Sequence, residues 1–316
     1  MIDRDESPSQ ELERNTITLG LTLLVVALLA VSSSAIFIRL SEGEISANAT
    51  VFNRVALSTL VFGFWHGLNG ASQTFFDDKP VQQKLDFSQD WWLFLAMAAF
   101  YITYQTLWAW SLTQTTVAIS TVLISLRPLF TCLLAGLLWG ERFDHKFSIG
   151  MIVAIAGTCA ISMGDLQIAS GQIQGDMAAL LAAIFAAGYL MTVEKLRTKF
   201  PPTTVILGCC GLGTLLGLPI LFFSEDRIFP YSMNGWMFVI CLAIVCQVLG
   251  QGLLAYSLKK FSSGLIALVL ILESILVAIA AWAIFGETLS FFKWIGFFVV
   301  LLGVYLAVSS KSAVKE

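Results

Sequence analysis

Ten hydrophobic runs follow one another along the chain, separated by short polar connections. They cover residues 17–37, 49–68, 91–112, 117–139, 147–163, 176–193, 204–223, 235–258, 264–285 and 291–309. A helix needs about 20 mostly apolar residues to cross the hydrocarbon core of a bilayer. Because no connection is long enough to fold as a soluble domain, the pattern predicts an all-α membrane protein with ten transmembrane helices.

The composition supports a lipid bilayer as the surroundings of the chain. Of the 316 residues, 57% are hydrophobic and 12% are charged, and soluble domains carry about twice that charged fraction. The formal net charge of -3 provides no basic surface for phosphate groups, so we expect no nucleic-acid partner. Six cysteines lie inside apolar runs without metal-ligand or redox spacing, and we interpret them as small buried hydrophobic residues.

Lys and Arg are distributed unevenly between the two sides that the ten runs define. Most lie in connections on the side of the N-terminus, whereas four lie on or near the other side: Arg39, Arg54, Arg227 and Lys293. Cytoplasmic loops carry the excess of positive charge in membrane proteins. We therefore predict a plasma-membrane protein whose two ends are both cytoplasmic, with tails at residues 1–15 and 311–316.

The two halves of the chain repeat one another. A shift of 146 residues aligns a glutamine, a Gly-Glu pair and two glycines: Gln105 with Gln251, Gly140-Glu141 with Gly286-Glu287, and Gly150 and Gly157 with Gly296 and Gly303. The predicted repeats, 16–164 and 175–310, begin five helices apart, and because five is odd the second repeat enters the membrane from the opposite side. Inverted repeats of this kind hold a substrate site near the midplane and expose it alternately to each side.

Three segments carry a family resemblance. They are Ser125–Thr131 continuing to Trp139–Arg142, its counterpart from Leu272–Ile275 to Phe285–Thr288, and Phe52–Arg54. Together with the duplicated layout, from about residue 19 to 309, they resemble EamA-type members of the drug/metabolite transporter superfamily. The resemblance implies five plus five helices around a central cavity, lined mainly by the first, third, fourth, sixth, eighth and ninth. It also implies a cargo of amino acids, other small metabolites or toxic compounds, often carried outward.

One position departs from that family pattern. The ninth helix often contains Glu-Pro, and this chain has Glu273-Ser274 there. Because proline removes a backbone hydrogen bond and kinks a helix, we expect a straighter ninth helix in this protein.

Arg127 and Glu273 are charges at equivalent positions near the centres of the fourth and ninth predicted helices. A charge at the bilayer centre costs about 2.5–3.5 kcal/mol on insertion scales, and such groups usually face the bundle interior or a wet cavity. Two interpretations stay open. The residues form a structural ion pair that holds the halves in register, or they bind substrate, with Arg127 holding a carboxylate and Glu273 an amine or a proton.

Further polar and aromatic side chains are candidates for substrate binding. They are Tyr104, Gln105 and Trp108 in the third helix, Gln247 and Gln251 one turn apart in the eighth, Tyr189 in the sixth and Ser34 in the first. An unmet hydrogen-bonding group in lipid costs several kcal/mol, so such side chains face a cavity or another helix. Hydrogen bonding between helices, without a substrate, is the alternative. Arg54, near the external end of the second helix, is expected to snorkel to the interface or to pair with Glu42 or Glu44.

Several chemistries are not indicated. The sequence has no Walker A, HExxH or G-x-S-x-G pattern, so we expect no enzyme, no catalytic residue, no metal site and no cofactor. The leading prediction is a secondary transporter that exports amino acids or related metabolites and toxic compounds. The alternatives are a membrane-embedded enzyme acting on lipid-linked substrates and a non-transporting partner subunit. A homodimer would use the peripheral fifth and tenth helices.

Overall fold

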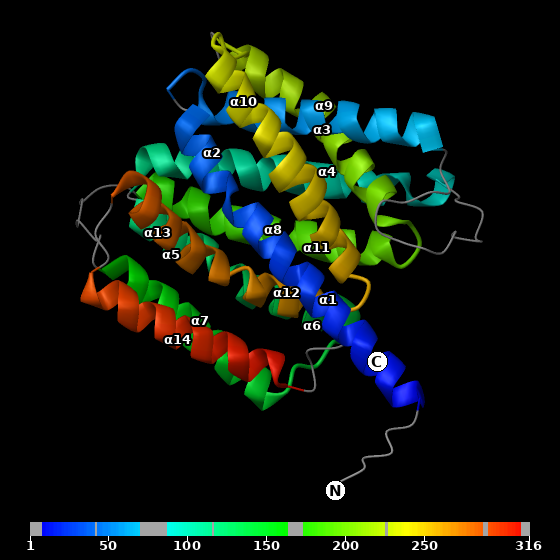
Figure 1. The fold of residues 1–316 in the computed structure, drawn as a ribbon, viewed down its shortest axis with the longest axis vertical. Helices are drawn as coiled ribbons and strands as arrows, with labels where there is room; N and C mark the ends of the chain where they lie inside the picture. The colour runs from blue at the N-terminus through cyan, green and yellow to red at the C-terminus, as the bar shows by residue number, and fades with distance from the viewer. Residues whose placement is uncertain are drawn as a thin grey trace, which may run out of the picture.

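The computed structural model describes residues 8–41, 43–69, 87–115, 117–163, 173–224, 227–286 and 290–310, and these are almost entirely helical. The helices are packed side by side in one bundle (Figure 1). Their bounds are α1 (Pro8–Ser32), α2 (Ser34–Ser41), α3 (Ala47–Asn69), α4 (Phe87–Gln114), α5 (Val117–Ile124), α6 (Arg127–Trp139), α7 (His145–Met163), α8 (Ile173–Arg197), α9 (Pro202–Ser224), α10 (Met233–Cys241), η1 (Leu242–Gln251), α11 (Gly252–Ser257), α12 (Ser263–Val269), α13 (Leu272–Phe285) and α14 (Phe291–Val308). The predicted tail at 311–316, the start of the tail at 1–15, and Glu42 and Glu287 lie outside the described residues.

Each of the ten hydrophobic runs falls on helical structure, which confirms the prediction of an all-α membrane protein. Within the described residues, seven helical stretches are long and apolar enough to cross a membrane: Leu19–Ser41, Ile119–Trp139, Ile173–Arg197, Pro202–Pro219, Met233–Ser257, Ser263–Ile284 and Phe291–Val308. His145–Ile161 in α7 is a shorter apolar helix. The two remaining runs form α3 and α4, which carry more polar side chains.

Serine side chains mark helix breaks that the hydrophobic pattern did not predict. α1 meets α2 at Ser33, whose hydroxyl donates to the carbonyl of Ala30 at 2.7 Å. α5 meets α6 after Ser125, whose hydroxyl donates to the carbonyl of Thr121 at 2.7 Å, and Pro128 in the first turn of α6 kinks the run at the same place. A hydroxyl that bonds back to the preceding turn competes for the helix carbonyls and bends the helix.

The expectation of a straight ninth helix is wrong. α12 ends at Val269 and α13 begins at Leu272, so the ninth run is broken at the position equivalent to the break between α5 and α6. The amides of Ile271, Glu273 and Ser274 donate to carbonyls three residues back, at 3.0–3.2 Å. The Ser274 hydroxyl also donates to the Ile271 carbonyl at 2.7 Å. The hydroxyl of Ser274 thus disturbs the helix where proline would otherwise do so.

Glycines that the repeat aligns make the closest contact between α7 and α14. A Cβ atom on Gly150 would lie 2.6 Å from the carbonyl oxygen of Gly303, and one on Gly157 would lie 2.6 Å from the amide nitrogen of Val300. A Cβ atom on Gly296 would in turn lie 2.8 Å from the carbonyl oxygen of Gly157. Only hydrogen fits between these backbones, so the two helices pack antiparallel at very short range (Figure 1).

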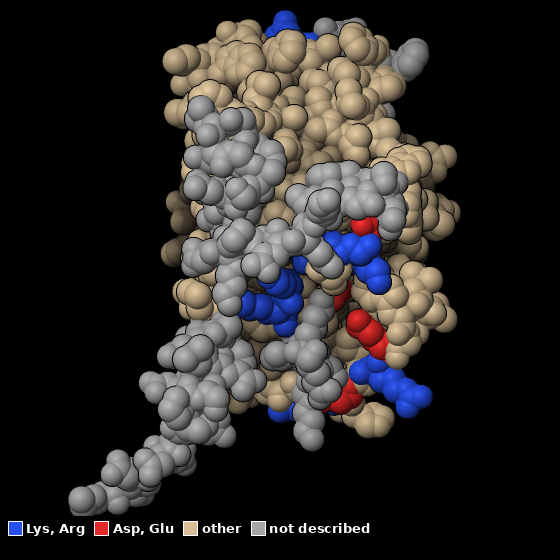
Figure 2. All heavy atoms as spheres, turned by 90° about the vertical axis from the view of Figure 1, so that its right-hand side faces the viewer, with Lys and Arg blue, Asp and Glu red and all other residues tan. Residues whose placement is uncertain are grey.

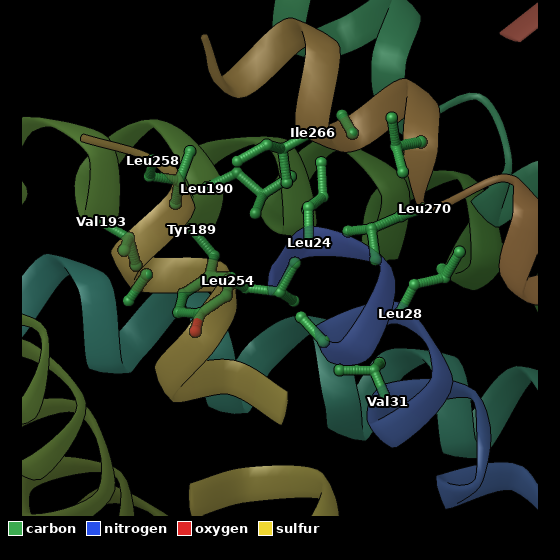
Figure 3. Packing of buried hydrophobic residues seen from close by; sticks show 14 of the residues in the cluster. Leu24, Leu28, Val31, Tyr189, Leu190, Val193, Leu254, Leu258, Ile266 and Leu270 are labelled. Carbon is green, nitrogen blue, oxygen red and sulfur yellow. The ribbon is translucent and has the colours of Figure 1, made fainter. Parts of the chain in front are cut away.

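The apolar core joins the first helix to the second half of the chain. Leu24, Leu28 and Val31 on α1 lie against Leu254 of α11 and Leu270 at the end of α12 (Figure 3). All of these side chains are at least nine-tenths buried. Within a bilayer, the close packing of these side chains stabilises the association of the two halves.

α1 begins and α14 ends at the same end of the bundle (Figure 1). At this end Lys146 Nζ donates to the Ser309 carbonyl at 3.0 Å, and Lys199 Nζ lies 2.9 Å from a carboxylate oxygen of Asp90. Figure 2 shows this face, with Lys, Arg, Asp and Glu gathered in its lower part. Its assignment to the cytoplasm stays a prediction.

At the opposite end of the bundle, Glu44 connects the first half of the chain to the start of α10. It lies in the connection between α2 and α3, and its carboxylate accepts hydrogen bonds from the hydroxyl of Ser232 and from the backbone N–H groups of Tyr231 and Ser232. These groups begin α10, where a negative charge is favourable. The hydrogen bond from the Ser232 side chain is the main cause that lowers the pKa of Glu44 below its usual 4.5.

Acidification should weaken this connection between the halves. Because the folded protein lowers the pKa of Glu44, the stabilisation is present above the pKa of the unfolded chain and is lost as the pH falls through the lowered value. We expect the unfolding temperature of the purified protein to fall between about pH 5 and pH 3, and Glu44→Gln to remove part of that fall. Identical pH profiles for the two proteins would contradict the assignment.

Candidate functional site

A polar cluster in the middle of the bundle joins the two halves. Gln247 of η1 is fully buried, and its Oε1 atom accepts hydrogen bonds from Tyr101 OH and Arg54 Nε, each at 2.8 Å. Gln105 Nε2 donates to Tyr101 OH at 3.3 Å, and Gln247 Nε2 donates to Cys210 Sγ at 3.4 Å. Tyr101 and Gln247 are 146 residues apart, so they occupy equivalent positions in the two repeats. Their contact therefore lies where the two halves face each other.

The segment that carries Gln247 and Gln251 is not a regular α-helix. Leu242–Gln251 is π-helical, between the α-helices α10 and α11. Such segments are rare, usually only one turn long, and frequent at functional sites. The sequence pattern predicted both glutamines but not the wider turn that presents them.

Three tyrosines lie next to this hydrogen-bonded group. The ring centroid of Tyr101 is 5.4 Å from that of Tyr104 and 5.1 Å from that of Tyr189, and Tyr104 and Tyr189 are 5.9 Å apart. Tyr189 OH donates to Gln251 Oε1 at 3.0 Å. Figure 3 shows the Tyr189 side chain beside Leu254 of α11. The predicted residues Tyr104, Gln105, Tyr189, Gln247 and Gln251 thus belong to one cluster that includes Tyr101.

The interpretation of Arg54 as an anchor at the membrane interface is wrong. Its side chain is 3% exposed, and the guanidinium reaches Gln247 in the core. Glu44, one of its expected partners, is bonded to Ser232 instead. A sequence signal was available, because Thr50, Arg54 and Ser58 repeat at a spacing of four residues and form a polar stripe along α3. All three are buried.

Arg127 and Glu273 begin two equivalent helices. Arg127 is the first residue of α6 and Glu273 the second of α13, each directly after a helix break. The charge of Glu273 interacts with those of Arg127 and Arg54, and the hydroxyl of Tyr104 interacts with all three. A carboxylate is favoured at a helix N-terminus and a guanidinium is not. The partial positive charge of each helix N-terminus therefore stabilises the carboxylate of Glu273 and destabilises the guanidinium of Arg127.

Among the described residues, the side chains of Arg127 and Glu273 form no direct ion pair. Arg127 Nε is buried and has no hydrogen-bond partner among the residues that the structure covers. The interpretation of a direct structural ion pair is not supported by this arrangement. A buried donor without a partner costs free energy, about 1–3 kcal/mol or more for a charged group.

Two predicted residues lie apart from the hydrogen-bonded group. Trp108, on α4, has a buried Nε1 atom that lacks a partner within the described part of the chain. Ser34 is the buried first residue of α2, and it is the neighbouring Ser33 whose hydroxyl contacts Cys246 Sγ of η1, at 3.3 Å. Among the described residues no group of three or more His, Cys, Asp and Glu could hold a metal ion.

The fold and the cluster define a polytopic membrane protein with buried and half-buried charges between two related halves, as in membrane transporters. A family model described as the EamA-like transporter family matches residues 18–163 and 173–309, once in each half. The chain belongs to this family, which is a family of transporters and not of enzymes. The resemblance noted in the sequence motifs is confirmed.

Individual relatives agree with this assignment. An uncharacterized transporter of Archaeoglobus fulgidus is 26% identical over 302 residues, which cover 92% of this chain and 97% of the relative. The pseudopaline exporter CntI of Pseudomonas aeruginosa is 21% identical over 168 residues, 53% of this chain and 57% of that protein. One solved crystal structure is similar in fold, with a TM-score of 0.75 at 17% identity, covering 92% of this chain and 96% of the other.

Proposed function

We propose that this protein is a secondary transporter that carries amino acids or related small metabolites out of the cell by alternating access. The observation that carries the proposal is the group of Arg54, Arg127 and Glu273, whose charges act on one another beside the buried glutamines and tyrosines that join the two halves. Charges at such depth are costly and mark solute or ion pathways in membrane proteins. A solute with complementary groups would offset that cost while it is bound.

Alternating access requires a motion of the two halves of the bundle relative to each other, and halves of opposite orientation allow it. Positions near the start of α8 lie beside the end of α4, as at Gly175 and Gln114, and positions near its end lie beside the start of α4, as at Phe200 and Phe94. α7 and α14 run antiparallel in the same way. These pairings support two inverted five-helix halves whose rocking exposes the cluster to each side in turn.

Outward transport is supported by the name of one relative, the pseudopaline exporter. The predicted orientation, with both ends in the cytoplasm of a plasma-membrane protein, is part of the same proposal and rests on the distribution of Lys and Arg. Tyr104, Gln105, Trp108, Tyr189, Gln247, Gln251 and Ser34 are proposed to line the solute path with the charged residues.

Exchange across liposomes tests the proposal. Purified protein is reconstituted into liposomes loaded with one unlabelled solute, and entry of the same labelled solute is followed for a panel of amino acids and small organic acids. We expect at least one solute to enter faster than into protein-free liposomes. If every member of the panel enters at the protein-free rate, the proposal is wrong.

A further inference from the structure

We propose that the transported solute is a small organic acid of net negative charge, and that Arg54 is a residue that determines this specificity. The proposal rests on the proposed transport function and assigns a chemical class to its substrate. It follows from a juxtaposition: two guanidinium groups, those of Arg54 and Arg127, share the polar cluster with the single carboxyl group of Glu273.

Hydrogen bonds between α3 and η1 hold Arg54 in the cluster. Its Nε atom donates to Gln247 Oε1 at 2.8 Å, which directs the guanidinium toward η1. One turn further along α3, the Ser58 hydroxyl donates to the Arg54 carbonyl at 2.7 Å and to the Ala243 carbonyl at 3.2 Å. These bonds fix α3 against η1 at the level of Arg54. The guanidinium is therefore positioned by the fold and is not an adaptable surface group.

The balance of charge in the cluster is positive in either protonation state of Glu273. Arginine stays protonated in proteins, so both guanidiniums are cations. Several other buried or half-buried carboxyl groups of the described residues are engaged outside the cluster: Asp90 with Lys199, Glu194 with the amide of Ser263, Asp176 with Thr115, Glu44 with Ser232, and Asp144 with the amide of Phe147. Two cations thus face one acid in a medium where an uncompensated charge is costly.

An anionic solute would compensate this excess. Guanidinium groups bind carboxylate and other oxyanions through paired, charge-assisted hydrogen bonds. Arg127 has a buried Nε donor without a partner among the described residues, and such a donor gains most from an acceptor. Glu273, at the start of α13, is placed to accept from an amino or hydroxyl group of the same molecule. A solute with two acidic groups and one donor would use all three residues.

Acid and amide pairs of equal shape test the charge requirement. Thermal unfolding of the purified protein is measured with L-glutamate and L-glutamine, L-aspartate and L-asparagine, and succinate and succinamate. We expect at least one acid to stabilise the protein at a concentration about tenfold lower than its amide does, because the amide loses a charge-assisted bond. If no acid stabilises the protein better than its amide, the proposal is overturned.

Variants of Arg54 test whether this residue causes the preference for an acid over its amide. Arg54→Gln should reduce the acid preference about tenfold, whereas Arg54→Lys keeps a cation and should retain most of it. Arg227→Gln removes an exposed arginine that lies over the Tyr231 ring, and it serves as the matched control with an unchanged preference. An acid preference that survives in Arg54→Gln would contradict the role of Arg54.

Binding and exchange separate this proposal from the proposed function. The same acid and amide pairs are used in the liposome exchange assay with the same variants. Acid-selective stabilisation without exchange would support the specificity and overturn transport. Exchange without any dependence on the acidic group, or with a preference that Arg54→Gln leaves intact, would support transport and overturn the specificity.

Discussion

Glu273→Gln should reduce the exchange of the preferred solute across liposomes by about 10- to 100-fold. Glutamine keeps the shape of the side chain but removes a carboxyl group whose charge interacts with those of both Arg127 and Arg54. A hydrogen bond to a charged group contributes about 1.5–3 kcal/mol, and the variant loses it where the solute binds. Initial rates of labelled solute entry at a fixed protein content measure the effect.

The control for Glu273→Gln is the same kind of substitution at a carboxyl group outside the cluster. Asp176, at the start of α8, accepts a hydrogen bond from Thr115 at 2.7 Å at the end of the bundle, and Asp176→Asn should leave the exchange rate within about twofold of the wild type. The unfolding temperature of each variant shows whether it is folded. An exchange rate of folded Glu273→Gln equal to that of the wild type would contradict a role of Glu273 in transport.

Gly303→Ala should strongly destabilise the bundle. A Cβ atom there would overlap the amide nitrogen of Ala154 and lie 2.8 Å from its Cα atom, so α7 and α14 would have to separate. Overpacking of this kind costs about 1–3 kcal/mol. We expect a lower unfolding temperature in detergent and a lower yield of monodisperse protein.

Gly63→Ala is the matched control for that substitution. Gly63 lies within α3 and no atom lies within 4 Å of the position that its Cβ would take. Alanine favours a helix over glycine by about 0.8–1.0 kcal/mol, so this variant should be as stable as the wild type or more so. Equal effects of Gly303→Ala and Gly63→Ala would contradict the close approach of α7 and α14.

The positions of the helices could be predicted from the sequence because burial in lipid demands long apolar runs, and this chain has few charges to interrupt them. The break before α6 could be predicted as well, because Pro128 lies there and proline kinks a helix. The breaks at Ser33 and Ser274 could not, since they depend on single hydroxyl groups bonding back to the preceding turn. The hydropathy of a run contains no information about such hydrogen bonds. The π-helical stretch of η1 escaped prediction for the same reason.

The sequence predicted those members of the candidate site that are polar residues in the middle of an apolar run. Gln247, Gln251 and Tyr189 were found in this way and lie in one cluster. Arg54 was misinterpreted because it lies near the start of its run, 49–68, where an arginine side chain can reach the membrane interface. Its direction depends on the packing of α3 against η1, which only the tertiary structure reveals.

Accessibility of the cluster from water tests the central claim, that a polar site between the two halves opens to each side of the membrane. Tyr104→Cys places a thiol beside Arg54, Arg127 and Glu273, in a background from which the six native cysteines are removed. A charged thiol reagent that cannot cross the bilayer is added to one side of oriented vesicles at a time. The account predicts modification from both sides, and a thiol that reacts from neither side in correctly folded protein would contradict it.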